Sequence, residues 1–146
     1  MPRKFVIPAL ALVAIGGAVG LTIAAQSNDS SKPVAQLIGE GIERHLTSSF
    51  QGPKANTGYA VHFIENGKAM LVVSDDFVIP DAPAPSWQLV DSNGNVYLLN
   101  QFKIKGGTNR KIAVPSYVRD ITKVQVWCSY AEVLLGEASF ARPVMN

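Results

Sequence analysis

Cysteine and histidine are scarce in this chain of 146 residues, which has one cysteine and two histidines. The single cysteine, Cys128, excludes an internal disulfide, so stability must come from burial and hydrogen bonding. A structural zinc ion needs four ligands, usually cysteine and histidine, and the chain has too few of them. Hydrolysis by a nucleophilic serine also has little support, because no Gly-x-Ser-x-Gly motif is present.

After the first four residues, the chain has no excess of positive or negative charge. The formal net charge of +2 rests on Arg3 and Lys4, because the remaining 11 basic residues are matched by 11 acidic ones. A balanced domain has no global field that recruits nucleic acid. The glycine pair Gly106-Gly107 has no helix after it that would complete a phosphate-binding loop. We therefore expect no nucleic-acid partner.

A long uncharged run follows the basic N-terminus, from Phe5 to Ala25. The apolar core of a signal peptide spans roughly 7–15 residues, whereas a membrane helix needs about 20. Positive charges favour the cytoplasmic side, so Arg3 and Lys4 place the rest of the chain outside the cytoplasm. Residues 1–25 are therefore predicted to be a single-pass membrane anchor. The alternative is a cleaved signal and a secreted or periplasmic product.

Residues 26–47 are predicted to be a linker followed by a short amphipathic helix. Gln26–Lys32 is polar, and Ser31 and Pro33 are typical of a helix start. Apolar residues then recur at helical spacing: Val34, Leu37, Ile38, Ile42 and Leu46. Gly39 and Gly41 weaken this helix, so packing must hold it. His45 would be a polar residue near its end.

Residues 48–142 are predicted to form a mainly β domain, an antiparallel β-sandwich or a barrel-like relative of it. Short apolar runs alternate with turn residues, without helical segments between them. The predicted hairpins pair Tyr59–Glu65 with Ala69–Ser74 around Asn66-Gly67, Ser86–Val90 with Asn95–Leu99, Phe102–Lys105 with Arg110–Val114, and Lys123–Ser129 with Val133–Leu135. The proline-rich stretch at residues 80–85 is predicted to be an extended loop.

The order of several short motifs between Ser48 and Phe140 resembles the Skeletor-type electron-transfer domain, the DM-thirteen family. The matching residues are Ser49-Phe50, Gly58, Leu71, Asp76-Phe77, Pro85-Ser86-Trp87, Gly106-Gly107, Val114-Pro115, Val124–Cys128, Gly136 and Ala138. The resemblance implies an extracellular β-sandwich proposed to take part in electron transfer. It also implies that Cys128 acts as a bare thiol or holds a prosthetic group such as haem. Any electron partner would be a separate protein.

Cys128 has two competing interpretations. It alternates with Val124 and Val126 on one apolar strand face, which favours burial, and a buried thiol in apolar surroundings reacts slowly. The family resemblance favours a redox or cofactor-binding site, with Trp127 and Tyr130 shaping or shielding it. The residues alone do not choose between these interpretations or identify a cofactor, although haem is possible.

Other candidate ligands have weaker support. His62 alternates with Val61 and Phe63, so we expect it to face solvent rather than to bind haem, and Met70 is a similar minor candidate. Asp75, Asp76 and Asp81 could offer oxygen atoms to calcium, but their spacing fits no calcium-binding loop. Four basic residues are interpreted as the solvated face of a hairpin whose Ile104 and Ile112 point inward: Lys103, Lys105, Arg110 and Lys111.

The sequence thus predicts a membrane-anchored, extracytoplasmic domain with a redox role centred on Cys128. The alternative is a non-catalytic envelope module, for binding or structure, with Cys128 packed in the core. A third possibility is an intermolecular disulfide through the same thiol.

Overall fold

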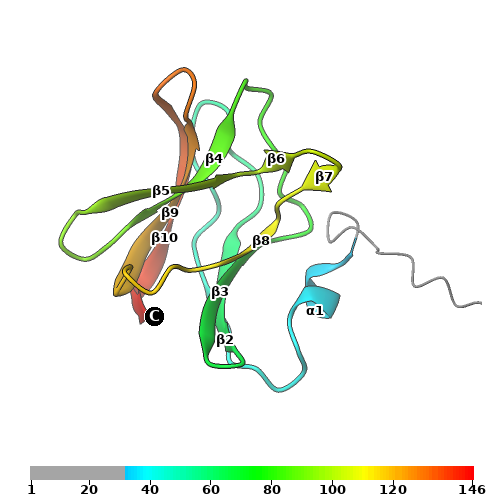
Figure 1. The fold of residues 1–146 in the computed structure, drawn as a ribbon, viewed down its shortest axis with the longest axis vertical. Coiled ribbons are helices and arrows are strands. Elements are labelled where there is room, and N and C mark those ends of the chain that lie inside the picture. Colours follow the sequence, from blue (N-terminus) through cyan, green and yellow to red (C-terminus); the bar gives the residue numbers. More distant parts are fainter. Residues whose placement is uncertain (1–31) are drawn as a thin grey trace, which may run out of the picture.

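The computed structural model describes residues 32–146 of the chain (Figure 1). The predicted anchor at residues 1–25 and the linker before Lys32 lie outside the described residues. Among residues 32–146, no helix has the length and apolar character that crossing a membrane requires.

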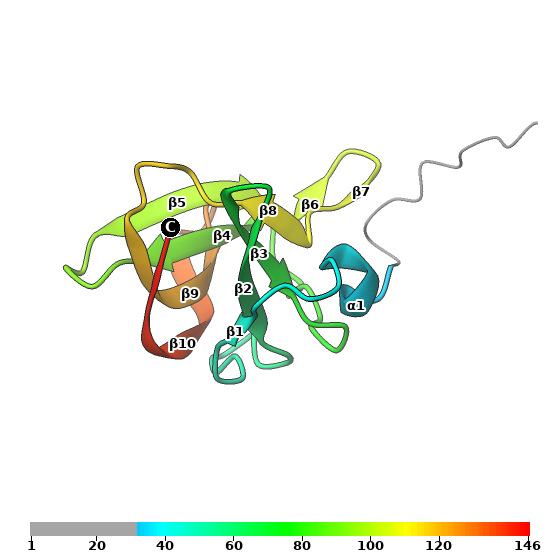
Figure 2. The same ribbon diagram turned by 90° about the horizontal axis from the view of Figure 1, so that it is seen from below.

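Two four-stranded antiparallel sheets form most of the domain, which confirms the predicted mainly β, antiparallel fold. The first sheet contains, in spatial order, β1 (His45–Leu46), β2 (Ala60–Glu65), β3 (Lys68–Val73) and β8 (Lys111–Ala113). The second contains β10 (Val133–Met145), β9 (Asp120–Cys128), β4 (Pro85–Val90) and β5 (Val96–Gln101). A small ribbon joins β6 (Lys103–Ile104) to β7 (Gly107–Thr108). Figure 2 shows the two main sheets as separate layers.

The main core lies between these sheets. Leu71 and Val73 of the first sheet and Val124 and Val126 of the second belong to one buried cluster. Trp87 of β4 is fully buried there. Its ring stacks on Phe102 at 4.6 Å between centroids, and its indole N–H donates to Asn109 O at 2.8 Å. This indole bond satisfies the one polar atom of the largest core side chain.

The hairpin of β2 and β3 follows the prediction closely. Asn66 and Gly67 have φ angles of 51° and 75°. Two successive residues with positive φ match the twist of antiparallel strands in a two-residue turn, and Asn-Gly is the pair that adopts them most readily. The prediction of this hairpin is confirmed.

The predicted hairpin that pairs Phe102–Lys105 with Arg110–Val114 is wrong. β6 pairs with β7, whereas β8 pairs with β3 of the other sheet. The chain therefore folds back only over the short β6–β7 ribbon, and after Thr108 it crosses to the first sheet. As a result Ile112 is buried, as expected, but Ile104 is 51% exposed.

The predicted amphipathic helix is correct only for its first turn. α1 spans Val34–Leu37, and the backbone is extended at Ile38. Gly41 has a φ of 72°, which a right-handed helix does not allow. Leu46, expected on the apolar stripe of the helix, lies in β1 and is 52% exposed.

The segment around α1 packs on the outer face of β2 and β3, on the side away from β10 (Figure 2). Leu37 and Ile38 are buried in a second cluster with Val61, Phe63 and Val72. Both faces of β2 are therefore covered. One faces the second sheet, and the other faces this segment.

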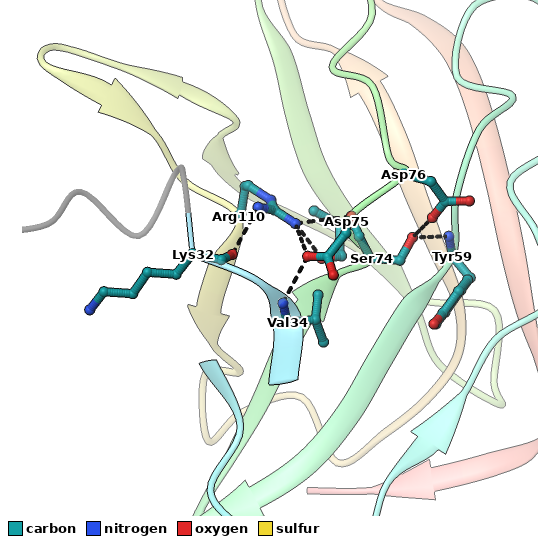
Figure 3. Close-up of polar contacts among 8 residues, drawn as sticks. Lys32, Val34, Tyr59, Ser74, Asp75, Asp76 and Arg110 are labelled. Carbon is teal, nitrogen blue, oxygen red and sulfur yellow. Dashed lines mark hydrogen bonds and ion pairs between the residues drawn. The ribbon is translucent and has the colours of Figure 1, made fainter. Parts of the chain in front are cut away.

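Polar contacts hold the same segment in place (Figure 3). Arg110 donates to Lys32 O at 3.3 Å and pairs with Asp75, at 3.3 Å between Nη2 and Oδ1. Asp75 Oδ1 also accepts a hydrogen bond from Val34 N at 2.8 Å. Lys111 donates to Leu37 O at 2.8 Å and forms an ion pair with Glu65 at 3.1 Å. Two of the four basic residues interpreted as a solvated face are thus structural ties.

The stretch from Thr47 to Gln51 closes the edge between the two sheets. Thr47 pairs with Phe140 of β10, and Gln51 pairs with Glu137. Chain crossing is tight near Gly136, where an added Cβ would overlap the carbonyl oxygen and Cβ of Ala55. We call this contact of residues 47–55 with β10 the seam. Beyond Phe140, β1 and β10 are no longer joined by such pairs, and the edge opens.

Candidate functional site

Cys128 lies in the main core, with 1% of its surface exposed. It pairs with Pro85 on one side and Val133 on the other. The Ala131 amide donates to its Sγ at 3.3 Å, and this hydrogen bond lowers the pKa of the thiol, with burial acting in the opposite direction. The thiol is therefore enclosed but has a polar partner.

Trp127 and Cys128 are neighbours on β9, so their side chains point to opposite faces of the sheet. Trp127 is half-buried, and Tyr130 in the following turn is 79% exposed. The strand therefore does not bring these predicted site residues to one face. Trp87, which the sequence analysis did not single out as a site residue, is the tryptophan that lies in the core beside the Cys128 strand.

Two of the three acidic candidates for calcium have other partners. Asp75 is paired with Arg110, and Asp76 accepts a hydrogen bond from Ser74 Oγ at 2.6 Å (Figure 3). Asp81 is exposed in the proline-rich loop. Within residues 32–146, no group of three or more His, Cys, Asp or Glu side chains is placed to hold a metal ion.

His62 is buried, with 2% of its surface exposed, which overturns the expectation that it faces solvent. As the alternation along β2 predicts, the side chain of His62 lies on the opposite face of the strand from those of Val61 and Phe63. The face of β2 that carries His62 is covered by the second sheet. Ala60, on the same face of β2, belongs to the main core, and Phe140 of β10 contacts the imidazole, at 6.3 Å between ring centroids.

Within the described part of the chain, neither nitrogen of His62 has a hydrogen-bond partner. Burial, followed by the nearby His45, lowers the pKa of His62 to about 4. At neutral pH the ring is therefore uncharged, with one nitrogen able to donate and the other able to accept. Buried polar atoms are usually paired, because an unpaired one costs about 1–3 kcal/mol. His62 is thus an exception that needs an explanation.

A groove with a volume of about 660 Å³ lies where the edge between the sheets opens, and His62 lines it. β1 contributes His45 and Leu46, and the end of β10 contributes Phe140, Val144 and neighbouring residues. His45 is directly paired with His62 across β1 and β2, with ring centroids 5.7 Å apart. Both histidines of the chain therefore meet in one place.

The end of β10 makes room for this groove. Its pairing with β9 shifts between Ser139 and Val144, so the residues between these two bulge away from β9. Ala141, Arg142 and Pro143 of this bulge form part of the groove wall. Bulges re-aim side chains beside binding sites, and here the bulge brings Arg142 to the rim.

The charge at the groove is positive. Arg44 and Arg142 line it together with the two histidines, and its lining residues include no acid. Both arginines are exposed, and neither has an ion pair or hydrogen bond in the described part of the chain. Glu43 lies next to the rim, with its Oε1 3.7 Å from His45 Nε2. The remaining lining residues are apolar and include Leu46, Ile64, Phe140, Val144 and Met145.

Comparisons with known proteins give no match. No family model, curated protein or solved structure matches this chain.

Proposed function

We propose that this domain is a non-catalytic binding module of the cell envelope and that the groove beside His62 is its ligand site. The observation that carries the proposal is a buried imidazole with two unpaired nitrogens at the base of an open groove. Leucine at this position would avoid the penalty of an unpaired polar group. An imidazole is useful there when a ligand supplies the missing hydrogen bond.

The size of the groove supports the same proposal. Sites for small molecules usually measure about 300–1,000 Å³, with mostly apolar walls and a few polar groups that orient the ligand. The groove, at about 660 Å³, lies within this range. Its walls come largely from strands, which hold side chains more firmly than loops do.

The two histidines provide a direct test, because both line the groove and the chain has no others. The full chain, without a histidine tag and in detergent, would be labelled with nitrogen-15 at histidine only. A library of neutral, cationic and anionic fragments would then be screened at millimolar concentration by imidazole NMR. We expect at least one fragment to shift the His62 signals and to lose its binding in His62→Leu. If no fragment of any charge moves either imidazole, the proposal fails.

A second candidate function is redox chemistry at Cys128, as the family resemblance implies. The hydrogen bond from Ala131 favours it, because lowering the pKa of a thiol increases the reactive thiolate fraction. An absorption spectrum with added haemin, compared with that of Cys128→Ala, tests the haem form of this function. A Soret band that depends on Cys128 would support it. If no band forms and thiol reagents react only on unfolding, both haem binding and a reactive thiol are eliminated.

We also propose that residues 1–25 anchor the domain with residues 32–146 outside the cytoplasm. The support is the uncharged run at residues 5–25 that follows Arg3 and Lys4. Protease treatment of intact cells or spheroplasts should degrade the domain while the anchor remains in the membrane fraction. Protection of the domain until the cells are lysed would contradict this orientation.

A further inference from the structure

The side chains that line the groove favour one chemical class of ligand, a small amphipathic anion. The argument for this class rests on the proposed function, since it concerns the same site. Three kinds of surface meet there: apolar walls, a neutral buried imidazole and two exposed guanidinium groups. Each places a different requirement on what can bind.

The apolar walls require a hydrophobic body. Phe140 and Val144 are buried on β10, and Ile64 extends the wall on β2 with 46% exposure. Burying apolar ligand surface against them would contribute about 25 cal/mol per Å². A ligand that is polar throughout would leave this contribution unused.

His62 requires a group that both donates and accepts hydrogen bonds, or a pair of such groups. Its uncharged ring has one N–H and one lone pair, and both are unpaired. An amide can serve either nitrogen, because it carries one donor and one acceptor, and a single amide reaches one of the two, since they point to opposite sides of the ring. A metal ion is a poorer fit, because the groove has two arginines and no acid among its lining residues.

Arg44 and Arg142 require negative charge. Guanidinium groups bind carboxylates through paired hydrogen bonds, and these two have no competing ion pair among the described residues. They come from different parts of the fold, Arg44 from the residue just before β1 and Arg142 from the β10 bulge. A carboxylate placed between the two elements would contact both sides of the opening.

We infer that the groove binds a small amphipathic organic anion in which an apolar body carries an amide near a carboxylate, as in N-acyl amino acids. The amide contacts His62, the apolar group lies against Phe140 and Val144, and the carboxylate contacts Arg44 and Arg142. The volume of the groove, about 660 Å³, suits a molecule of this size.

The test uses N-acetyl-phenylalanine and its neutral analogue, N-acetyl-phenylalaninamide, with the histidine-labelled full chain at low salt. We expect the acid to bind about five- to tenfold more tightly than the amide, because each exposed charge contact adds a fraction of a kcal/mol. 3-Phenylpropionate, which lacks the amide, should bind more weakly than the acid and should shift His62 less.

Arg44→Gln and Arg142→Gln should each reduce the preference for the acid about two- to threefold, and both together should remove it. Lys103→Gln is the matched control, because it removes one exposed positive charge from β6, outside the groove. All three residues are exposed, so folding should be preserved. Raising the salt concentration should reduce the same preference.

The possible failures are distinguishable. If the acid and the amide bind equally well, and the arginine variants behave like Lys103→Gln, the inference about an anion is wrong while the binding module stands. If neither probe binds, the inference is overturned. The wider fragment screen then decides whether the proposed function fails with it.

Discussion

Cys128 and His62 are almost equally buried, yet their surroundings differ completely. The thiol is enclosed at one end of β9 and receives a hydrogen bond from Ala131. The imidazole has no partner and borders the groove. Along β9, Ile121 pairs with the groove-lining Val144, so seven residues, or roughly 23 Å, separate the two regions. The degree of burial alone therefore does not distinguish the two residues, whereas the unpaired nitrogens and the adjoining groove make His62 the stronger candidate for a site.

The largest contrast concerns tolerance to added volume. Gly136→Ala would force a methyl group into Ala55 at the seam, and overpacking of this kind should lower the free energy of unfolding by about 3 kcal/mol. Ala141→Val adds volume at the exposed groove wall and should change it by less than about 0.5 kcal/mol. Urea unfolding measures both values. Equal effects would mean that the two ends of β10 are packed alike.

The next contrast concerns pH. Because the pKa of His62 falls from 6.5 to about 4 on folding, only the unfolded chain binds this proton between those values. The contribution of the neutral imidazole to the free energy of unfolding is therefore fully present above pH 6.5 and is lost as the pH falls toward 4. We expect a loss of roughly 2–3 kcal/mol, somewhat less than the full shift because the groove admits water. Unfolding measured across this range in the chain and in His62→Leu isolates the effect.

Thiol replacement should have a smaller effect. Cys128→Ala leaves a small cavity and removes the acceptor of Ala131 N–H, so the free energy of unfolding should fall by about 1–2 kcal/mol. The exposed Tyr130→Ala serves as control, with an expected change below about 0.5 kcal/mol. Ligand binding in the groove should be unchanged in both variants. Loss of groove binding in Cys128→Ala would show that the two regions are coupled.

The smallest expected effect has the opposite sign. His62→Leu removes an unpaired buried polar group and should raise the free energy of unfolding at pH 7 by about 1 kcal/mol, while groove binding is lost. His45→Leu, at a largely exposed position, should give no such gain. A destabilised His62→Leu would mean that the imidazole has a structural partner after all.

Local signals in the sequence predicted much of the fold. Asn66-Gly67 predicted the turn of the first hairpin. Pro80 and Pro83 predicted the long loop before β4, but the prediction extended this loop one residue too far, because Pro85 begins β4 and pairs with Cys128. Alternation at Val124, Val126 and Cys128 predicted the buried face of β9, and these residues are all in the core. Each of these features depends on neighbouring residues alone, which is why the sequence carries it.

Tertiary contacts decided what the sequence could not. Alternation along β2 separates His62 from Val61 and Phe63, but it does not reveal that both faces are covered. The spacing of apolar residues from Val34 to Leu46 is typical of a helix. The chain instead turns at Gly41, and His45 pairs with β2 as part of a strand. β8 likewise pairs with β3 because the crossing chain completes the first sheet.

The candidate site was the least predictable part. No spacing in the sequence shows that His45 and His62 are cross-strand partners. Arg44 and Arg142 lie about a hundred residues apart in the chain and line the same groove only because the seam holds the chain near β1 against β10. The unpaired state of His62 is a property of the packed structure.

The ties around α1 have a mechanical consequence. A force applied to the chain ahead of Lys32 would first load the contacts of Arg110 and Asp75, then that of Lys111 with Leu37. These contacts involve Lys32, Val34 and Leu37, which follow one another along the chain. They would therefore break one after another before the strands carry any load. The segment from Lys32 to Ile38 would thus detach before such a force reached the strands that line the groove.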